Sequence, residues 1–299
     1  MTSDPELDAV MSERRQLINL AYRLTGSLAD AEDAVQETYA RWYAMSEQER
    51  TAIRSPGGWL MTVASRICLD LLGSARARRE RYVGEWLPEP VPAGWLGGRP
   101  GSPVTDPADR VTLDDSISMA FLVVLDAMTP AERVAFILHD VFGYPFAEVA
   151  DIVGRSTAAC RQLASSARRR LATAAPPTAT SQRAAVVKQF KEAWEAKDIA
   201  ALVGLLDPDA AATSDGGGVA RAHLAPIEGS EQIARAYLEI ADAEPRLRFV
   251  ERTVNGQPGL VGLIGDELVT VFAFDVEDDR IRNIWAVRNP HKLHAWLAG

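Results

Sequence analysis

The stretch Met128–Leu171 reads MTPAERVAFILHDVFGYPFAEVADIVGRSTAACRQLASSARRRL and decides the fold class of the helical part of the chain. Its beginning, Thr129-Pro130-Ala131-Glu132, has the capping-box pattern that starts a helix. Apolar residues then recur at helical spacing, and Gly143 and Gly154 interrupt them. Two helices joined by a short turn that contains glycine are typical of a helix-turn-helix. The stretch therefore predicts this arrangement, closed by a final helix after Ser156.

The final helix of this stretch has one apolar face and one basic face. Five arginines and no acidic residue occur in residues 155–171. The inner face is predicted to consist of Cys160, Leu163, Ala167 and Leu171. Arginine can pair with guanine edges, glutamine with adenine, and further arginines with phosphates, so we predict that this helix binds DNA. The alternative is a solvated amphipathic helix that closes a bundle. The predicted DNA-contacting residues are Ser156, Thr157, Arg161, Gln162, Ser165, Arg168 and Arg169.

Residues 12–80 also carry apolar residues at helical spacing, without a strand pattern. The segment Asp30–Tyr43, DAEDAVQETYARWY, predicts an acidic helix, which is either a solvated face or a protein-docking surface. Ser55-Pro56 predicts the start of another helix, because proline in the first turn lacks an N–H that would be unpaired anyway. Basic residues gather at the end of that helix, where they also favour the helix dipole, so this signal by itself is weak. Gly73 predicts that the helix ends or bends there.

Two segments divide the chain into three parts. Residues 81–110 contain six prolines and five glycines, a density that excludes both helix and strand and predicts a linker or an ordered irregular segment. Its apolar residues Trp86, Leu87, Trp95 and Leu96 predict that it packs against another part of the protein. The second break, ATAAPPTATS, is short and uncharged and covers residues 172–181.

The third part, Gln182–Gly299, differs in kind from the first two. It is predicted to begin with helices, the second of which includes Leu202, Val203 and Leu206, and a later helix covers residues 230–241. Residues 247–251, 268–276 and 281–288 alternate at period two, which predicts strands of a curved antiparallel sheet. Helices packed on such a sheet make an α+β domain.

Composition limits the function classes. The chain has 299 residues with 32 Lys and Arg against 41 Asp and Glu, a net charge of −9. This excludes a histone-like protein that coats DNA by bulk charge, but it is compatible with a local basic surface. The acidic first ten residues and the absence of a long apolar run predict a cytoplasmic protein without a membrane segment. Cys68 and Cys160 are predicted to be small buried side chains, with redox sensing as the alternative.

Taken together, the motifs resemble, in order and spacing, an extracytoplasmic-function (ECF) sigma factor of bacterial RNA polymerase. The resemblance implies core RNA polymerase and promoter DNA as partners. It implies that Asp30–Tyr43 docks on the polymerase, that residues 55–80 recognise and melt the −10 element, and that Met128–Leu171 binds the −35 element. The residues implied for polymerase binding are Asp30, Asp33, Gln36, Glu37 and Arg41, and those for the −10 element are Arg66, Asp70, Arg76, Arg78 and Arg79.

Three further motifs resemble a subgroup of these sigma factors with a fused SnoaL-like domain, a cone-shaped α+β barrel. They are WLPEP (Trp86–Pro90), DGGG (Asp215–Gly218) and NPHKL (Asn289–Leu293). The resemblance divides the chain into sigma region 2 (1–80), a linker (81–110), region 4 (111–173), a second linker (174–181) and the SnoaL-like domain (182–299). The residues implied in regulation are Trp86, Leu87, Pro88, Glu89, Pro90, Asp215, Gly216, Gly217, Gly218, Asn289, Pro290, Lys292 and Leu293. Val219 and His291 stand where the subgroup usually has Lys and Asp.

The role of the third part has three interpretations. It is a clamp or regulator acting in cis, a sensor that binds an unidentified small ligand, or an enzyme in which Asp215 is a general base. The regulator is the preferred interpretation, and neither catalysis nor a cofactor or metal is expected. DGGG is equally explained as a tight turn, because glycine permits positive φ. For the whole protein, the alternative to a sigma factor is a ligand-controlled helix-turn-helix regulator.

Overall fold

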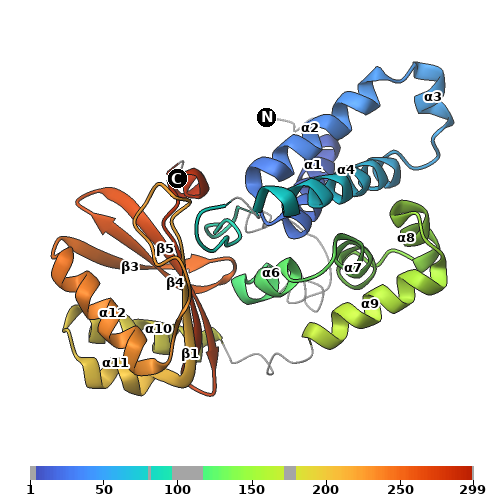
Figure 1. Cartoon of the computed structure of the whole chain (residues 1–299). Coiled ribbons are helices and arrows are strands. Elements are labelled where there is room, and N and C mark those ends of the chain that lie inside the picture. Colours follow the sequence, from blue (N-terminus) through green and yellow to red (C-terminus); the bar gives the residue numbers. More distant parts are fainter. Residues whose placement is uncertain (1–4, 80–81, 96–116, 172–179, 298–299) are drawn as a thin grey trace. The chain divides into compact units, whose positions relative to one another are not determined.

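The computed structural model describes residues 5–79, 82–95, 117–171 and 180–297 (Figure 1). The chain divides into two compact units. One contains Met1–Glu80 and Val124–Thr173, and the other contains Arg81–Val123 and Ala174–Gly299. The segment rich in proline and glycine therefore belongs to the same unit as the C-terminal part of the chain.

The described residues of the first unit form helices. Its elements are α1 (Pro5–Thr25), α2 (Leu28–Ala44), α3 (Glu47–Ala52), α4 (Pro56–Arg79), α7 (Pro130–Phe136), η1 (Ile137–Val141), α8 (Phe146–Val153) and α9 (Thr157–Leu171), while α6 (Met119–Asp126) begins in the second unit and ends in the first. The predicted capping box is confirmed: the Glu132 N–H donates to the Thr129 hydroxyl, and the Thr129 N–H donates to the Glu132 carboxylate. The helix predicted from Ser55-Pro56 continues through Gly73 to Arg79, so the prediction that it ends at Gly73 is wrong.

The helix-turn-helix is formed by α8 and α9. Gly154 ends α8 with a left-handed φ of 67°, and the hydroxyl of Ser156 caps α9 by accepting the N–H of Ala159. The fully buried residues of α9 are Cys160, Ala164 and Ala167. Leu163 and Leu171 of the predicted inner face are partly buried, and Ala164 belongs to this face as well. Small residues occupy the inner face, so α9 can lie close to α7 and α8.

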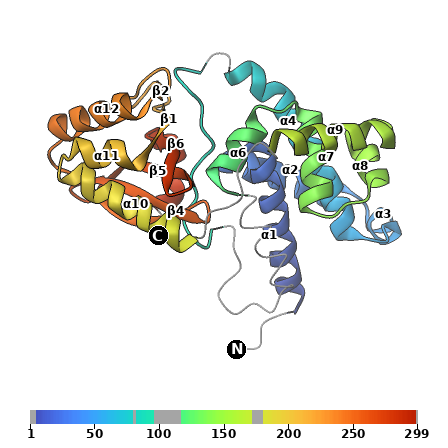
Figure 2. The ribbon, with the colours of Figure 1, turned by 90° about the horizontal axis from the view of Figure 1, so that it is seen from below.

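The second unit contains a mixed six-stranded sheet with helices on one face (Figure 2). The helices are α10 (Thr180–Glu195), α11 (Ile199–Leu205) and α12 (Ser230–Ala243); the strands are β1 (Leu206–Asp215), β2 (Ile227–Glu228), β3 (Leu247–Val254), β4 (Gln257–Ile264), β5 (Glu267–Glu277) and β6 (Arg280–Val287), in the order β2-β1-β6-β5-β4-β3. Short 3₁₀ helices, η2 (Pro290–Lys292) and η3 (His294–Trp296), follow the sheet. The predicted fold class, two all-α parts and an α+β domain, is confirmed.

Two features of the sheet differ from the prediction. Leu206 was expected in a helix but begins β1, which pairs in parallel with β6, so the sheet is not purely antiparallel. The register between these strands shifts between Leu206 and Ala211, and this irregularity accommodates Pro208, which cannot donate to a sheet ladder. β4 was not predicted, because Pro258, Gly259 and Gly262 interrupt the alternation that identifies a strand.

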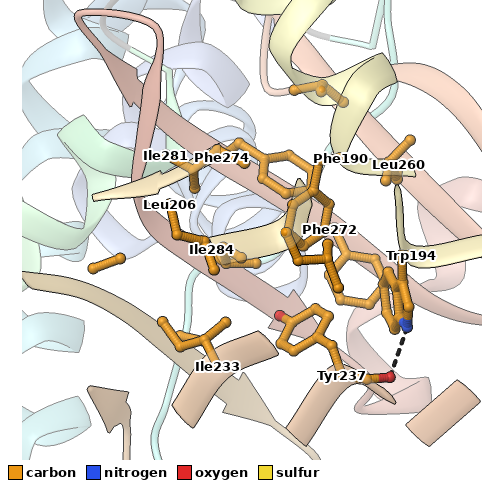
Figure 3. Packing of buried hydrophobic residues seen from close by; sticks show 14 of the residues in the cluster. Phe190, Trp194, Leu206, Ile233, Tyr237, Leu260, Phe272, Phe274, Ile281 and Ile284 are labelled. Atoms are coloured by element: carbon orange, nitrogen blue, oxygen red, sulfur yellow. Dashed lines mark hydrogen bonds between the residues drawn. The ribbon is translucent and has the colours of Figure 1, made fainter. Parts of the chain in front are cut away.

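Aromatic rings fill the space between the sheet and its helices (Figure 3). The Trp194 ring lies 4.2 Å from Phe249 and 4.5 Å from Tyr237, measured between ring centroids. The Trp194 indole N–H donates to the backbone carbonyl of Tyr237 over 2.7 Å, which satisfies the polar atom of this buried ring. Phe190, Phe272 and Phe274 pack edge-on or stacked around the same centre. This dense aromatic packing makes the domain interior a core.

The opposite face of the sheet is contacted by Leu87 of the linker and by Met119 at the start of α6. Leu87 and Met119 pack against sheet residues that include Val261, Val271 and Trp285 in one buried cluster. The prediction that the linker packs is therefore confirmed for Leu87, which is 3% exposed. Trp86 and Trp95 are partly buried, and Leu96 lies outside the described residues.

Candidate functional site

The three motifs that resemble the sigma subgroup meet around one buried carboxylate. Asp215 ends β1 and is 0% exposed. Its Oδ1 accepts the Tyr82 hydroxyl over 2.6 Å, and its Oδ2 accepts the Leu87 N–H over 2.9 Å. Lys292 completes the set with an ammonium 2.6 Å from Oδ2. Segments that are far apart in the sequence therefore share a single charged group.

Lys292 provides the positive charge from the other end of the second unit. Its ammonium also donates to the backbone carbonyl of Leu87 over 2.5 Å. It lies 4.1 Å from the centre of the Trp86 ring and 5.1 Å from that of Tyr82, which are cation–π distances. With a side chain only 7% exposed, this lysine is removed from water, and its charge is balanced by Asp215.

Asn289 connects the end of the sheet to the linker. Its side-chain NH₂ donates to the Tyr82 hydroxyl over 2.8 Å, and its Oδ1 accepts the His291 N–H over 3.0 Å. The backbone carbonyl of Asp215 accepts the N–H of Asn289 over 2.9 Å. Pro290 starts the short helix that carries Lys292. Tyr82, Leu87, Asp215, Asn289 and Lys292 are called the Asp215 cluster below.

The glycines of DGGG form a tight turn against this cluster. Gly217 has a left-handed φ of 62°, and a Cβ added there would lie 2.3 Å from Nδ2 of Asn289. A Cβ on Gly216 would lie 2.2 Å from the carbonyl of Ala220, and one on Gly218 would lie 3.1 Å from Val83. Glycine is therefore required here for close approach as well as for backbone conformation.

Asp215 does not have the surroundings of a general base in the residues that the structure describes. A base needs an oxygen within reach of a substrate proton, whereas both Asp215 oxygens bond to other groups of the chain. His223, the nearest candidate partner in the sequence, is exposed. Burial raises the pKa of Tyr82 well above its usual value, and its hydrogen bond to Asp215 raises it further. Tyr82 is therefore held as a neutral donor. Sequence reasoning missed this residue, because nothing in its irregular segment marks it.

The residues predicted to bind the −35 element lie on α9. Arg161, Gln162, Ser165 and Arg169 are exposed on it. Arg168 is exposed as well, but its guanidinium forms two hydrogen bonds with Asp140 of η1, of 2.5 and 3.2 Å. Thr157 is partly buried in the first turn. The described part of the helix therefore presents a polar and basic face opposite its small apolar one.

The residues predicted to bind the polymerase share one face of α2. Asp33, Gln36, Glu37 and Arg41 are exposed and Asp30 is partly buried, while the opposite face carries buried apolar residues. Glu37 and Arg41 form an ion pair of 2.8 Å one turn apart. Of the −10 residues, Arg66 and Asp70 are exposed on α4. The end of α4 contains Arg76, Arg78 and Arg79, whose side chains the structure does not describe.

In the first unit, the helices of residues 5–79 contact those that include the helix-turn-helix. The buried Arg133 of α7 donates to the carbonyl of Leu24 over 2.7 Å and to Asp126 over 2.9 Å. Arg66 donates to the carbonyl of Asp151 in α8 over 3.0 Å. The candidate −10 residue Arg66 is thus bonded to the helix that precedes the candidate −35 helix.

Comparison with known proteins agrees with this organisation. Residues 9–78 match Sigma-70 region 2, and residues 118–171 match Sigma-70 region 4. The ECF RNA polymerase sigma factor SigJ of Mycobacterium tuberculosis is 39% identical over 94% of this chain and 90% of its own length. The chain belongs to the ECF family of RNA polymerase sigma factors.

Two further comparisons cover nearly the whole of this ECF sigma factor. The probable ECF sigma factor SigI of the same species is 35% identical over 97% of this chain and 95% of its own. The crystal structure of SigJ superposes with a TM-score of 0.75 at 35% identity, covering 97% of this chain and 98% of that one. The similarity thus includes the C-terminal α+β domain.

Membership of the family identifies the protein as an alternative sigma factor. Its region 2 and region 4 imply binding to core RNA polymerase and to promoter DNA. None of the described helices is long and apolar enough to cross a membrane. Within the described residues, no group of three or more His, Cys, Asp or Glu side chains could hold a metal ion.

Proposed function

We propose that the C-terminal domain of this ECF sigma factor modulates promoter-directed transcription in cis, through the Asp215 cluster. The observation that carries the proposal is the buried ion pair between Lys292 and Asp215, both of which bond to the backbone of Leu87. The domain therefore binds the chain at Tyr82 and Leu87, shortly after the matched region 2 ends. A change in the hydrogen bonds of the cluster therefore changes how the start of the linker is held.

The contacts of the cluster depend on one another, so the linker is expected to be released from all of them together. Removing one partner of a buried ion pair typically costs about 3–5 kcal/mol, because the other charge is left buried and unpaired. Tyr82, Asn289 and the Leu87 backbone share the same carboxylate or its ligands. Loss of one contact thus weakens the others, and the linker is either held or released.

We assign the exposed surfaces of the first unit to the partners of a sigma factor. The face of α2 with Asp33, Gln36 and Glu37 binds core polymerase. Arg66 and Asp70, with the arginines at the end of α4, act at the −10 element. Arg161 and Gln162 of α9 read the −35 element, and Arg169 contacts phosphate, which supplies affinity without sequence choice.

Promoter geometry requires the first unit to open. The two elements are centred about 25 base pairs apart, roughly 85 Å at 3.4 Å per base pair. Arg66 bonds directly to α8, next to the −35 helix. Both elements are bound together only after contacts such as Arg66–Asp151 and Arg133–Leu24 separate. A domain that holds the connecting chain is well placed to control that separation.

The packing of the C-terminal domain favours a regulator over a ligand sensor. Its interior is occupied by aromatic side chains, including Trp194, Phe249 and Phe272. A small ligand would have to displace part of this core. The regulator interpretation needs no such displacement, because it uses the opposite face of the sheet.

Run-off transcription with core polymerase tests the proposal. The template is a promoter selected by the reconstituted holoenzyme from a random library, used as duplex and with a mismatched bubble. Asp215→Asn and Lys292→Met are expected to change transcript yield in the same direction, and the double variant to change it little more. Lys197→Ala removes the exposed pair with Asp242 in the same domain and is the control.

Unchanged yield in both single variants would refute modulation through the cluster. A wild-type chain that binds DNA without core, and gives no transcript with it, would favour the ligand-controlled helix-turn-helix regulator. Transcripts from wild type and altered transcripts from the two variants would support the proposal.

A further inference from the structure

A buried asparagine lies at the tip of the β3–β4 hairpin. Asn255 is 0% exposed and has a left-handed φ of 50°, and Gly256 follows with a φ of 72°. Asn-Gly is the preferred pair for a two-residue hairpin turn with two positive φ values, so the backbone of the turn is explained locally. The local sequence does not explain why Asn255 is buried, because turns usually lie at the protein surface.

The two ends of the Asn255 amide bond to two distant parts of the chain. Its Oδ1 accepts the N–H of Val91 over 3.0 Å, and its Nδ2 donates to the carbonyl of Ile117 over 2.9 Å. Its own N–H donates to the Val91 carbonyl over 2.9 Å, and Pro92 forms an antiparallel bridge with Val254. These bonds hold Val91 and Ile117 within about 8 Å of each other.

The surroundings of the amide strengthen these bonds. Val91 and Val254 are each 1% exposed, and Ile117 is 7% exposed. Met119, two residues after Ile117, packs in the same apolar cluster as Val254. A hydrogen bond that is shielded from water is costly to break without a replacement, since the separated groups would stay desolvated.

We propose that Asn255 closes the base of the segment that connects regions 2 and 4, and so limits how far region 4 can move from region 2. Val91, Ile117 and Asn255 are called the Asn255 clasp. The proposal rests on the function proposed above and adds a second control point, separate from the Asp215 cluster. The match to region 4 begins at residue 118, directly after Ile117, so the clasp holds the start of the matched region.

The number of residues between Val91 and Ile117 determines how far apart these two residues can move when the clasp opens. A chain as long as residues 92–116 can extend to about 80 Å, against about 8 Å when its ends are held. The difference is similar to the roughly 85 Å that separates the two promoter elements. Release of the clasp would therefore let regions 2 and 4 separate far enough to bind the −10 and −35 elements at the same time.

Substitutions at Asn255 can break the two halves of the clasp separately. Aspartate has the same shape and tolerates the left-handed region, and it still accepts the Val91 N–H, but in its ionised form it cannot donate to the Ile117 carbonyl. Asn255→Asp should release Ile117 and keep the bond to Val91, while Asn255→Gly keeps the turn and releases both. Asp278→Gly is the matched control, because Asp278 is an exposed left-handed residue in the β5–β6 turn.

Hydrogen exchange of the full-length protein tests the clasp directly. Asn255→Asp is expected to speed exchange about tenfold in residues 117–123 and to leave residues 84–95 within about twofold of wild type. Asn255→Gly should speed both segments, and Asp278→Gly neither. Unchanged exchange at 117–123 in Asn255→Asp would overturn the clasp, and this variant decides the matter if Asn255→Gly does not fold.

Transcription on templates with lengthened spacing between the two elements tests the consequence for reach. Wild type should lose activity steeply as the spacing grows, and Asn255→Asp should lose at least about threefold less on the longest templates. If Asn255→Asp altered hydrogen exchange but left the dependence of transcription on spacing unchanged, the clasp would not limit the distance between regions 2 and 4. Absence of core-dependent transcripts from wild type would refute the proposed function, while the exchange data would still judge the clasp.

Discussion

Three residues of the C-terminal domain, of which Lys292 and Asn255 are buried and Trp296 is partly buried, bind the linker by its main chain. Lys292 bonds to the carbonyl of Leu87, Trp296 to that of Pro90 over 2.8 Å, and Asn255 to both backbone groups of Val91. At these positions the linker contributes backbone atoms, whereas the domain contributes the Lys292 ammonium, the Trp296 indole and the Asn255 amide. Substitutions on the domain side are therefore expected to release the linker more effectively than substitutions of Pro90 or Val91.

The turn at Gly217 gives the first prediction at this scale. Gly217→Ala must place a Cβ where Nδ2 of Asn289 now lies, in addition to adopting a left-handed φ. Gly265 has a similar φ of 63°, and a Cβ there would meet nothing within 4 Å. Gly217→Ala should therefore lower the free energy of unfolding by at least about 1 kcal/mol more than Gly265→Ala, as measured by denaturant titration. Equal losses would show that Asn289 moves freely.

The Tyr82 hydroxyl gives a prediction for alkaline pH. Because its pKa is raised in the folded protein, the folded state keeps this proton when the unfolded chain has lost it. The stabilisation from Tyr82 is thus fully present below pH about 10 and falls as the pH rises further. The stability difference between wild type and Tyr82→Phe should shrink over that range. A difference that stays constant to pH about 11 would contradict the assignment.

At the scale of elements, α9 separates the readout of bases from the positioning of the helix. Arg168 is held by Asp140 of η1, and Arg170 donates to the carbonyl of Ala127 over 3.0 Å. Arg161 lies over the ring of Phe146 at 5.6 Å, and within the part of the chain that the structure describes it forms no ion pair with a carboxylate. The first two arginines therefore orient the helix on its neighbours, and Arg161 is the candidate for a base contact.

Binding of the holoenzyme to −35 variants tests this division of roles. Arg161→Ala should weaken binding to the preferred sequence by about 1–3 kcal/mol and relax the preference at one position. Arg169→Ala is the comparison, since loss of a phosphate contact should weaken all sequences equally and reduce the salt dependence. An equal loss on all sequences for Arg161→Ala would make Arg161 a phosphate contact.

At the scale of the whole molecule, the C-terminal domain covers apolar residues of the linker and of the start of region 4. Leu87 and Met119 are both 3% exposed and lie in a cluster with Val287 and Leu293. Deleting the domain would expose these side chains to water, so effects of deletion mix lost regulation with lost stability. Point variants and short truncations are therefore the cleaner probes.

A chain that ends at Leu293 gives the prediction at this scale. It keeps the Asp215 cluster but loses the bond from the Trp296 indole to the Pro90 carbonyl. Promoter output is expected to shift in the same direction as in Asp215→Asn, but by less. A chain ending at Pro176 should give the largest change. If that chain matched wild type in both promoter output and affinity for core polymerase, regulation in cis would be wrong.

Local patterns determined the helices, the caps and the turn of the DNA-binding region, because a capping box such as Thr129 to Glu132 is decided by neighbours in the chain. They did not determine β1 or β4. Pro208, Gly259 and Gly262 disfavour strands locally and are tolerated only because the adjoining strands impose the pairing.

The candidate site likewise combines features that local sequence determines with features that only the tertiary structure determines. The motifs around Trp86, Asp215 and Asn289 were identified from the sequence, but their convergence on one carboxylate, with Tyr82 as a further donor, comes from the tertiary structure. Asn255 was not identified from the sequence, because the pair Asn255-Gly256 indicates no more than a hairpin turn. Its bonds to Val91 and Ile117 depend on chain segments far from it in sequence. Local spacing encodes local hydrogen bonds, whereas partners at long range are chosen by which surfaces the fold buries together.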